Sequence, residues 1–210
     1  MKRMKIIITL CVSVLFILAV CGGCAISQPG NQTANMEPPD APAAVPPGFA
    51  PSAPEMAPQL DALLTTGSSP EQRVRAIQLA TSWMFVDEDG NCSGIESDSP
   101  HALQLHPSEF AEVTLQLVDG NNNNIELHFS DNYPPESVSA QRWDTEYARS
   151  DQDAGAQDID EALGKSEAVE LDGSAIIVSD DGHDYIYFVH AVWPNGNSNY
   201  AFRTESASNP

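Results

Sequence analysis

The fold is decided by the stretch Tyr185-Ile-Tyr-Phe-Val-His-Ala-Val-Trp193. Its odd-numbered positions form an uninterrupted apolar face, and its even-numbered positions form a second face that is also largely apolar. Side chains alternate between the two faces of a β-strand, so this pattern is typical of a strand in the middle of a sheet. We therefore expect both faces of this strand to be covered, partly by loops.

Further strand patterns lie at residues 77–85, 112–117, 125–129, 137–143, 168–171, 175–178 and 199–203. Turn-forming residues separate them, among them Asp172-Gly173, Pro194-Asn195-Gly196 and Asp181-Gly182, the last expected as a type I′ hairpin turn. The acidic segment 151–165 is expected to connect the sheets, with one helical turn at most. About eight short strands predict an all-β fold, an immunoglobulin-like antiparallel sandwich, over residues 69–210.

Aromatic side chains concentrate on the predicted strands. They are Trp83, Trp143, Tyr185, Tyr187, Trp193, Tyr200 and Phe202. At period-two spacing such residues usually form the core or cross-strand pairs. Exposed tryptophans could instead form a platform for carbohydrate or peptide. The pattern alone does not say which face they occupy, so it leaves both alternatives open.

The N-terminus carries an export signal. Lys2, Arg3 and Lys5 precede an apolar run over residues 6–21, and two glycines then lead into Cys24. This layout resembles the bacterial lipoprotein signal, whose peptidase needs small residues before the lipid-bearing cysteine. Residues 1–23 are therefore the predicted signal peptide and Cys24 the predicted lipidation site, with Cys21 as the competing acceptor. The alternative, an uncleaved membrane helix, would need about 20 apolar residues.

Residues 24–68 are rich in proline and alanine, with Pro-Pro at 38–39 and 46–47. Such a stretch has little apolar surface with which to order itself, so we expect a disordered tether. Its end, residues 58–64, could form one or two helical turns. We expect the remaining residues, 69–210, to fold without the tether.

The chain carries 9 Lys and Arg residues against 30 Asp and Glu residues. Binding to phosphate backbones relies on clustered cations, so this balance argues against nucleic acid as a partner. The acidity serves solubility in the first interpretation, and weak capture of divalent cations in the second. Cys92 is the one cysteine of the predicted domain, so no disulfide can form within it. We expect it to be a small buried apolar residue.

No motif of a hydrolase, metalloprotease or phosphate-binding loop is present in the sequence. We therefore expect no cofactor, no metal site and no catalytic residue. The histidines are His101, His106, His128, His183 and His190, and their scatter fits ordinary surface or core positions. Asp87, Asp89 and Asp98 recur at a spacing like that of a calcium loop, but Cys92 stands where that loop needs glycine, so an acidic turn is the favoured interpretation.

Four segments together resemble a known family. They are Ser82-Trp83 with Cys92-x-Gly94, Pro134-Pro135 with Arg142-Trp143, the stretch 185–193, and Tyr200-Ala201-Phe202. They are similar to a small extracytoplasmic β domain of Bacillota, found in lipid-anchored or signal-bearing proteins and at the outer end of membrane metallopeptidases of the beta-lactam-sensor type. The likeness covers roughly residues 70–205. The His-Glu-x-x-His of those peptidases is missing from this sequence, so the resemblance implies no peptidase activity.

The leading hypothesis is a non-enzymatic surface lipoprotein at the outer face of the bacterial cell membrane. Its lipid anchor and tether would hold out a β-sandwich for ligand or protein binding, or for envelope sensing, with a protein or the cell wall as partner. A second hypothesis is an extracellular enzyme acting on carbohydrate or cell wall with Asp87, Asp89 and Asp98. A third is a structural component of an envelope complex, for which a large apolar surface patch would be evidence.

Overall fold

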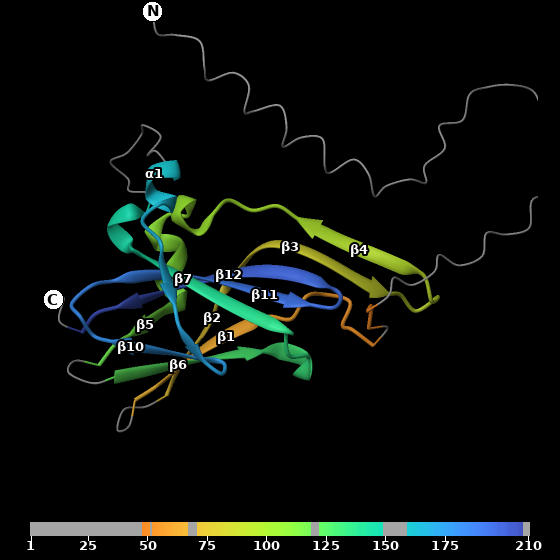
Figure 1. Ribbon diagram of the computed structural model, residues 1–210, viewed down its shortest axis with the longest axis horizontal. Helices are drawn as coiled ribbons and strands as arrows, with labels where there is room; N and C mark the ends of the chain where they lie inside the picture. Colours follow the sequence, from red (N-terminus) through yellow and green to blue (C-terminus); the bar gives the residue numbers. More distant parts are fainter. Residues whose placement is uncertain (1–47, 51, 67–70, 119–121, 149–158, 208–210) are drawn as a thin grey trace, which may run out of the picture. The chain divides into compact units, whose positions relative to one another are not determined.

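The computed structural model describes residues 48–50, 52–66, 71–118, 122–148 and 159–207. The predicted signal peptide, Cys24 and the first part of the predicted tether lie outside this part of the chain. Within it, the chain forms twelve strands in two sheets (Figure 1). The prediction of an all-β antiparallel sandwich is confirmed.

The smaller sheet has five strands in the order β2 (Gln72–Arg75), β1 (Leu60–Thr65), β6 (Asn122–Phe129), β10 (Ala175–Ser179) and β9 (Leu171–Asp172). The larger sheet has the order β4 (Cys92–Ser97), β3 (Ile77–Val86), β12 (Gly196–Glu205), β11 (Tyr185–Trp193), β7 (Ser137–Asp144) and β8 (Glu167–Val169). The short β5 (Thr114–Gln116) lies parallel to the end of β12 and is the one parallel pairing among the described strands.

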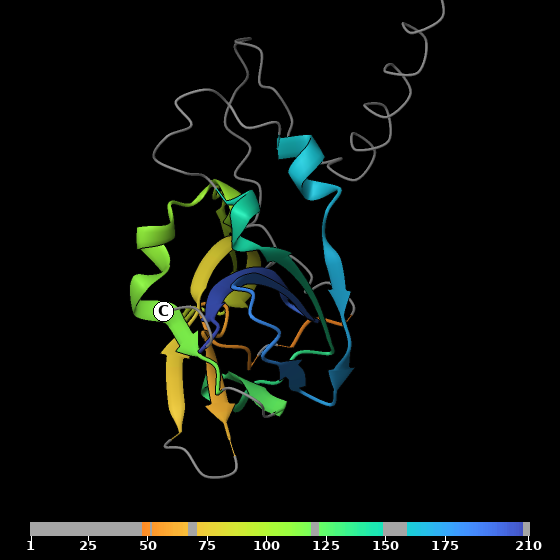
Figure 2. The same cartoon turned by 90° about the vertical axis from the view of Figure 1, so that its left-hand side faces the viewer.

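Two corners join the sheets on opposite sides of the sandwich (Figure 2). At the first corner β2 of the smaller sheet runs directly into β3 of the larger one through the buried Ala76, whose N–H donates to the Leu60 carbonyl at 2.9 Å. At the second, β8 of the larger sheet runs into β9 of the smaller one through Glu170. Strands that switch sheets in this way make the corners of a sandwich.

The predicted strand aromatics form the core. Each of the seven is at most 8% exposed. Trp193 packs edge-on against Trp83 and Phe129, with ring centroids 5.5 and 5.4 Å apart, while Tyr187 stacks on Phe202 at 5.1 Å. The aromatic platform is therefore wrong for these residues, because six of them are buried between the sheets and Trp143 is buried on the outer face of the larger sheet.

Strand β11 is buried on both faces, as its sequence predicts. Tyr187, Val189 and Trp193 point into the inter-sheet core, and Ile186 points to the outer face of the larger sheet. There it meets a second cluster built with the short helices η1 (Ala102–Gln104), η2 (Pro107–Val113) and α1 (Ile159–Leu163). Trp143 belongs to this cluster, and its indole N–H donates to the Ala162 carbonyl at 3.2 Å. The two remaining short helices are η3 (Ser130–Asn132) and η4 (Thr145–Tyr147).

The predicted boundary between tether and domain is wrong. Residues 60–65, expected in the tether and with a helical tendency, form β1 between β2 and β6 in the smaller sheet. Leu60, Ala62 and Leu64 are at most 1% exposed, so this strand is part of the core. Leu63 interrupts the apolar alternation, and the β6 partner lies far along the chain, which explains why local sequence did not reveal the strand.

The chain enters the sandwich through a clamp made by the Asn195 side chain. Asn195 is 3% exposed. Its side-chain oxygen accepts from the Ala50 N–H at 3.3 Å and from the Tyr133 hydroxyl at 2.9 Å. Its side-chain N–H groups donate to the carbonyls of Ala50 at 3.2 Å and Met84 at 3.0 Å. Residues well before β1 therefore pack on the domain.

Two of the predicted turns close hairpins, and one does not. Asp172-Gly173 lies between β9 and β10, and Pro194-Asn195 joins β11 to β12. The Asp181-Gly182 hairpin is wrong, because β10 belongs to the smaller sheet and β11 to the larger one. That turn passes between the sheets. Of the predicted strand 112–117 only β5 is extended, since η2 occupies the residues up to Val113.

Candidate functional site

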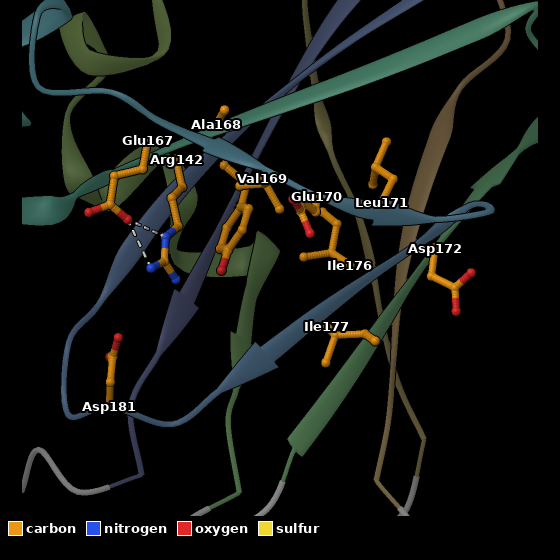
Figure 3. Close-up of a pocket in the computed structure, with 11 residues that line it drawn as sticks. Arg142, Glu167, Ala168, Val169, Glu170, Leu171, Asp172, Ile176, Ile177 and Asp181 are labelled. Carbon is orange, nitrogen blue, oxygen red and sulfur yellow. Dashed lines mark hydrogen bonds and ion pairs between the residues drawn. The ribbon is translucent and has the colours of Figure 1, made fainter.

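A cavity of about 460 Å³ opens at the second corner, between β7 and β8 of one sheet and β9 and β10 of the other (Figure 3). We call it the seam pocket. Its lining residues are Arg142, Glu167, Ala168, Val169, Glu170, Leu171, Asp172, Ile176, Ile177, Asp181 and Tyr187. Five of these eleven residues are charged, so the pocket is more polar than the mainly apolar sites that bind most small molecules.

Pairing between strands places the polar groups of the seam pocket in one row. Across the larger sheet Tyr187 of β11 is opposite Arg142 of β7, which is in turn opposite Glu167 of β8. Arg142 follows the buried Ala140 on the same face of β7, so its side chain lies on the inter-sheet side. Directly opposed residues in a sheet lie within contact distance, so strand register brings this row together.

Arg142 is held on two sides. Its guanidinium nitrogens Nε and Nη2 each lie 2.9 Å from one carboxylate oxygen of Glu167. Its central carbon lies 4.0 Å from the centroid of the Tyr185 ring, which is a cation–π contact. Figure 3 shows the Arg142 and Glu167 side chains reaching toward each other and Asp181 pointing toward them from the connection after β10. The guanidinium has five N–H donors in a fixed plane, so this arrangement leaves donors for a further acceptor.

The Tyr187 hydroxyl is buried and makes no hydrogen bond of regular geometry to a described residue, although the Arg142 guanidinium is near enough to interact with it. A buried polar group without a partner costs about 1–3 kcal/mol, so such a group calls for an explanation. Burial raises the pKa of Tyr187, and its hydrogen-bonding and charge interactions with the Arg142 guanidinium oppose that shift. Burial also raises the pKa of Tyr185, whose hydroxyl donates to Asp181 at 2.7 Å. Both phenols therefore stay neutral near pH 7 and can donate a hydrogen bond.

Carboxylates outnumber cations around the seam pocket. Glu167, Glu170, Asp172 and Asp181 line it together with the single cation Arg142. The pocket therefore offers donors at Arg142 and Tyr187, and an excess of negative charge around them. A ligand that is only anionic would be repelled, whereas a ligand with an acceptor at one end and a cation at the other fits both features.

A second cavity, of about 620 Å³, lies beyond β9 and is lined by residues of β6, β7 and the segment that joins them. Its Tyr133 hydroxyl already donates to Asn195, and its His128 ring lies 2.9 Å from a carboxylate oxygen of Glu126. These polar groups are in use within the protein, so this cavity makes the weaker candidate.

The acids of the catalytic and calcium hypotheses do not come together. Asp87 closes the turn between β3 and β4, where its carboxylate accepts from the backbone N–H groups of Asp89 at 3.1 Å and Asn91 at 2.8 Å. Asp98 follows β4 and is separated from that turn by the whole strand. The interpretation of an acidic turn is confirmed, and the calcium loop over Asp87, Asp89 and Asp98 is wrong, because residues 92–97 form strand β4. No group of three or more metal-ligating side chains occurs within the described residues.

The histidines hold local structure in separate places. His101 and His106 cap η1 and η2 through their Nδ1 atoms, which accept backbone N–H groups at 3.3 and 3.2 Å. His183 lies 2.9 Å from Asp144, and His190 lies 2.7 Å from Asn199. These positions match the expectation of ordinary surface or core histidines.

Cys92 is half-buried at the start of β4 rather than fully buried, because β4 is an outer strand. Sequence reasoning also missed Arg142 as a site residue. The available signal was a cation at an inward position of a strand, in register with Val138 and Ala140. The role of Arg142 in a site depends on Tyr187 and Glu167. These residues are distant in sequence, and strand pairing places them beside Arg142.

Comparison with family models, with curated proteins and with solved structures found no match. The likeness to the Bacillota β domain thus stays a prediction. Among the described residues, no helix has the length and apolar character needed to cross a membrane.

Proposed function

We propose that this chain is a non-enzymatic surface lipoprotein that presents the β-sandwich at the outer face of the bacterial cell membrane and binds a small ligand in the seam pocket. The signal-like N-terminus and Cys24 support the anchor. The proline-rich sequence before residue 48 supports a spacer between anchor and domain. Lipid attachment through a diacylglycerol supplies two chains, which makes anchoring stable where a single chain would be marginal.

The observation that carries the binding role is the buried Tyr187 hydroxyl beside Arg142, which lacks a hydrogen bond of regular geometry. Its interaction with Arg142 is not a regular hydrogen bond, so part of the cost of burying this hydroxyl is not offset. A ligand acceptor between Tyr187 and Arg142 would remove that cost. The free energy of binding would then include the relief of this penalty as well as the new hydrogen bonds. The same two donors would orient the ligand.

The ligand class follows from the charges of the pocket. A carboxylate or carbonyl would accept from Arg142 and Tyr187, and an ammonium group would lie near Asp181 or Glu170 at the opening. Ile176 and Val169 provide the apolar wall between them. We propose a zwitterionic amino acid or short peptide as the ligand.

The two other functions lose support. The enzyme hypothesis relied on Asp87, Asp89 and Asp98, which lie at different ends of β4. In the seam pocket Tyr187 stays protonated near pH 7, because burial raises its pKa, so it is unsuited to the role of general base. The structural hypothesis needs a large apolar patch, whereas the exposed large apolar side chains of the described residues, Met56, Met84, Ile95, Leu163 and Ile177, are dispersed over separate elements.

Free L-leucine tests this ligand class. Its binding is measured by amide chemical-shift changes of the mature chain without lipid. We expect shifts confined to β7, β8 and β10, and weaker binding of leucinamide, which lacks the carboxylate, and of N-acetyl-leucine, which lacks the cation. Shifts spread over the whole surface, or equal affinity for all three, would contradict the proposal.

Tyr187→Phe is the matched variant, since it removes only the hydroxyl. We expect it to weaken L-leucine binding about tenfold, while the melting temperature stays level or rises because a buried hydroxyl without a regular hydrogen bond is gone. Tyr185→Phe is the control for losing a phenol that has a partner. Unchanged binding in Tyr187→Phe would exclude the hydroxyl from the site.

The anchor is tested separately. Cys24→Ser should accumulate as unprocessed precursor without lipid label, and Cys21→Ser should be processed normally. The opposite result would assign the lipid to Cys21.

A further inference from the structure

The hairpin of β3 and β4 extends from the sandwich, and β4 is the last strand of the larger sheet (Figure 1). It pairs with β3 on one side and has no strand on the other among the described residues. Four of its six residues are exposed. A sheet edge of this kind offers unpaired backbone groups to another extended chain.

The hydrogen bonds of Met84 in β3 show which backbone groups of β4 point away from the sheet. Both its N–H and its carbonyl bond to Asn195, on the side of β3 away from β4, at 2.8 and 3.0 Å. Met84 opposite Gly94 is therefore a pair without mutual hydrogen bonds. Such pairs alternate with hydrogen-bonded ones along an antiparallel ladder, so the N–H and carbonyl groups of Cys92, Gly94 and Glu96 point outward.

Strand β4 lacks most of the usual protections of an edge strand, and Glu96 is its one charged residue. It contains no proline, no lysine and no bulge, since its register with β3 is unbroken from Ser97 to Cys92. Gly94 needs no special space within the domain, because a Cβ there would lie 3.6 Å from the nearest atom, an ordinary contact. Glycine within a strand can mark the close approach of another backbone.

Charge identifies the occupant. Residues 77–98 contain Asp87, Glu88, Asp89, Glu96 and Asp98 and no lysine or arginine. Pairing β4 with a second copy of the chain would bring two such acidic hairpins together, and like charges across a pair of strands are destabilising. A segment rich in lysine or arginine would be attracted instead.

We infer that β4 is a docking edge for an extended cationic peptide segment, which adds a strand to the larger sheet through the backbone of Cys92, Gly94 and Glu96. Backbone bonds provide affinity in this mode, and side chains provide selectivity. The inference is independent of the seam pocket, which lies at the opposite end of the strand order.

The test uses the mature chain without lipid and a synthetic peptide of about eight residues that alternates lysine and threonine. We expect binding that weakens with salt, and slower amide hydrogen exchange at Cys92, Gly94 and Glu96 but not at Ser93 and Ile95. The alternating protection is the signature of strand addition, because general attraction by charge would not produce it. The same peptide with glutamate in place of lysine should not bind.

Two changes, one in the protein and one in the peptide, remove hydrogen bonds between the backbones of β4 and the peptide. Gly94→Pro deletes one outward N–H and should weaken binding about tenfold. N-methylation of alternate peptide residues removes the peptide's own donors and leaves the protein unchanged, so it tests the same bonds if Gly94→Pro fails to fold. Unaltered binding in both cases would overturn strand addition. Protection of the three amides before any peptide is added would overturn it as well, because a second copy or another part of the chain would then hold the edge.

Discussion

Strands β11 and β4 belong to the same sheet and show opposite ways of being stable. Strand β11 has partners on both edges and is covered on both faces, whereas β4 pairs with β3 alone among the described strands and is mostly exposed. Burial of apolar side chains stabilises the first. The second depends on its hairpin, whose turn is closed by Asp87. The comparison teaches that one sheet combines a deeply buried centre with an exposed edge.

The largest effect is expected from removing a buried strand altogether. A chain that begins at residue 69 lacks β1, and with it Leu60 and Leu64, so the smaller sheet loses the strand between β2 and β6. We expect no cooperative thermal unfolding by calorimetry. A chain that begins at Gly48 should unfold cooperatively, since it keeps both Ala50 and β1. Cooperative unfolding of the shorter chain would show that β1 is dispensable.

Single substitutions in β11 and β4 should differ in the same way in their effect on the free energy of unfolding. Trp193→Ala empties a buried site between Trp83 and Phe129, and we expect it to lower the free energy of unfolding by about 3–5 kcal/mol. Ile95→Ala, on the exposed strand β4, should cost less than about 1 kcal/mol. Urea denaturation measures both. Similar costs would remove the distinction between centre and edge.

Two glycines on either side of β3 provide a finer comparison. Gly196 begins β12 with φ +146, and a Cβ there would lie 2.0 Å from the Ser82 carbonyl oxygen. Gly94 in β4 has room for one. We expect Gly196→Ala to cost more than about 2 kcal/mol, and Gly94→Ala to be neutral or stabilising by a few tenths, to about 1 kcal/mol. If thermal melts of the two variants coincide, the close approach at Gly196 is not maintained in solution.

The smallest expected effect is on the pH dependence of stability, to which a buried and an exposed histidine contribute in opposite directions. His101 stacks on Phe188 and lies edge-on to Trp143, and burial lowers its pKa. Its contribution to stability is complete above the unfolded pKa of about 6.5 and is lost as pH falls toward the lowered folded value. His183 is exposed, and Asp144 raises its pKa, so its contribution is present at low pH and is lost as pH rises through that raised value.

NMR titration should place the pKa values of His101 and His183 on opposite sides of the ordinary value. His101→Asn keeps a helix-capping side chain but cannot titrate, so its stability should fall less than that of the native chain between about pH 7 and pH 5. The same pH dependence in both proteins would mean that His101 does not contribute to it.

Hydrophobic alternation predicted the parts of the fold that are buried by many neighbours. The stretch Tyr185–Trp193 predicted both its own strand and its two covered faces, and residues 77–85 predicted β3. It failed for β4, because Cys92-Ser-Gly-Ile-Glu-Ser97 buries little and carries little pattern. It failed for β1, whose proline-rich surroundings concealed a strand that depends on β6.

The seam pocket could not be predicted for a different reason. The row Tyr187, Arg142 and Glu167 combines three strands, and its order is a property of register rather than of any local sequence. Arg142 was visible as an unusual residue, but its role required knowledge of which residues lie opposite it. Turn chemistry was more local, so Asp87 and Gly173 were predicted correctly.

The Asn195 clamp gives the domain a mechanical property. A pull on the chain before residue 48 is transmitted to Ala50, whose backbone N–H and carbonyl are both bonded to the Asn195 side chain. The load therefore passes to the β11–β12 hairpin at the centre of the larger sheet before it reaches β1. For a domain held at a membrane by its N-terminal end, tension would be resisted first at the most deeply packed part of the sandwich.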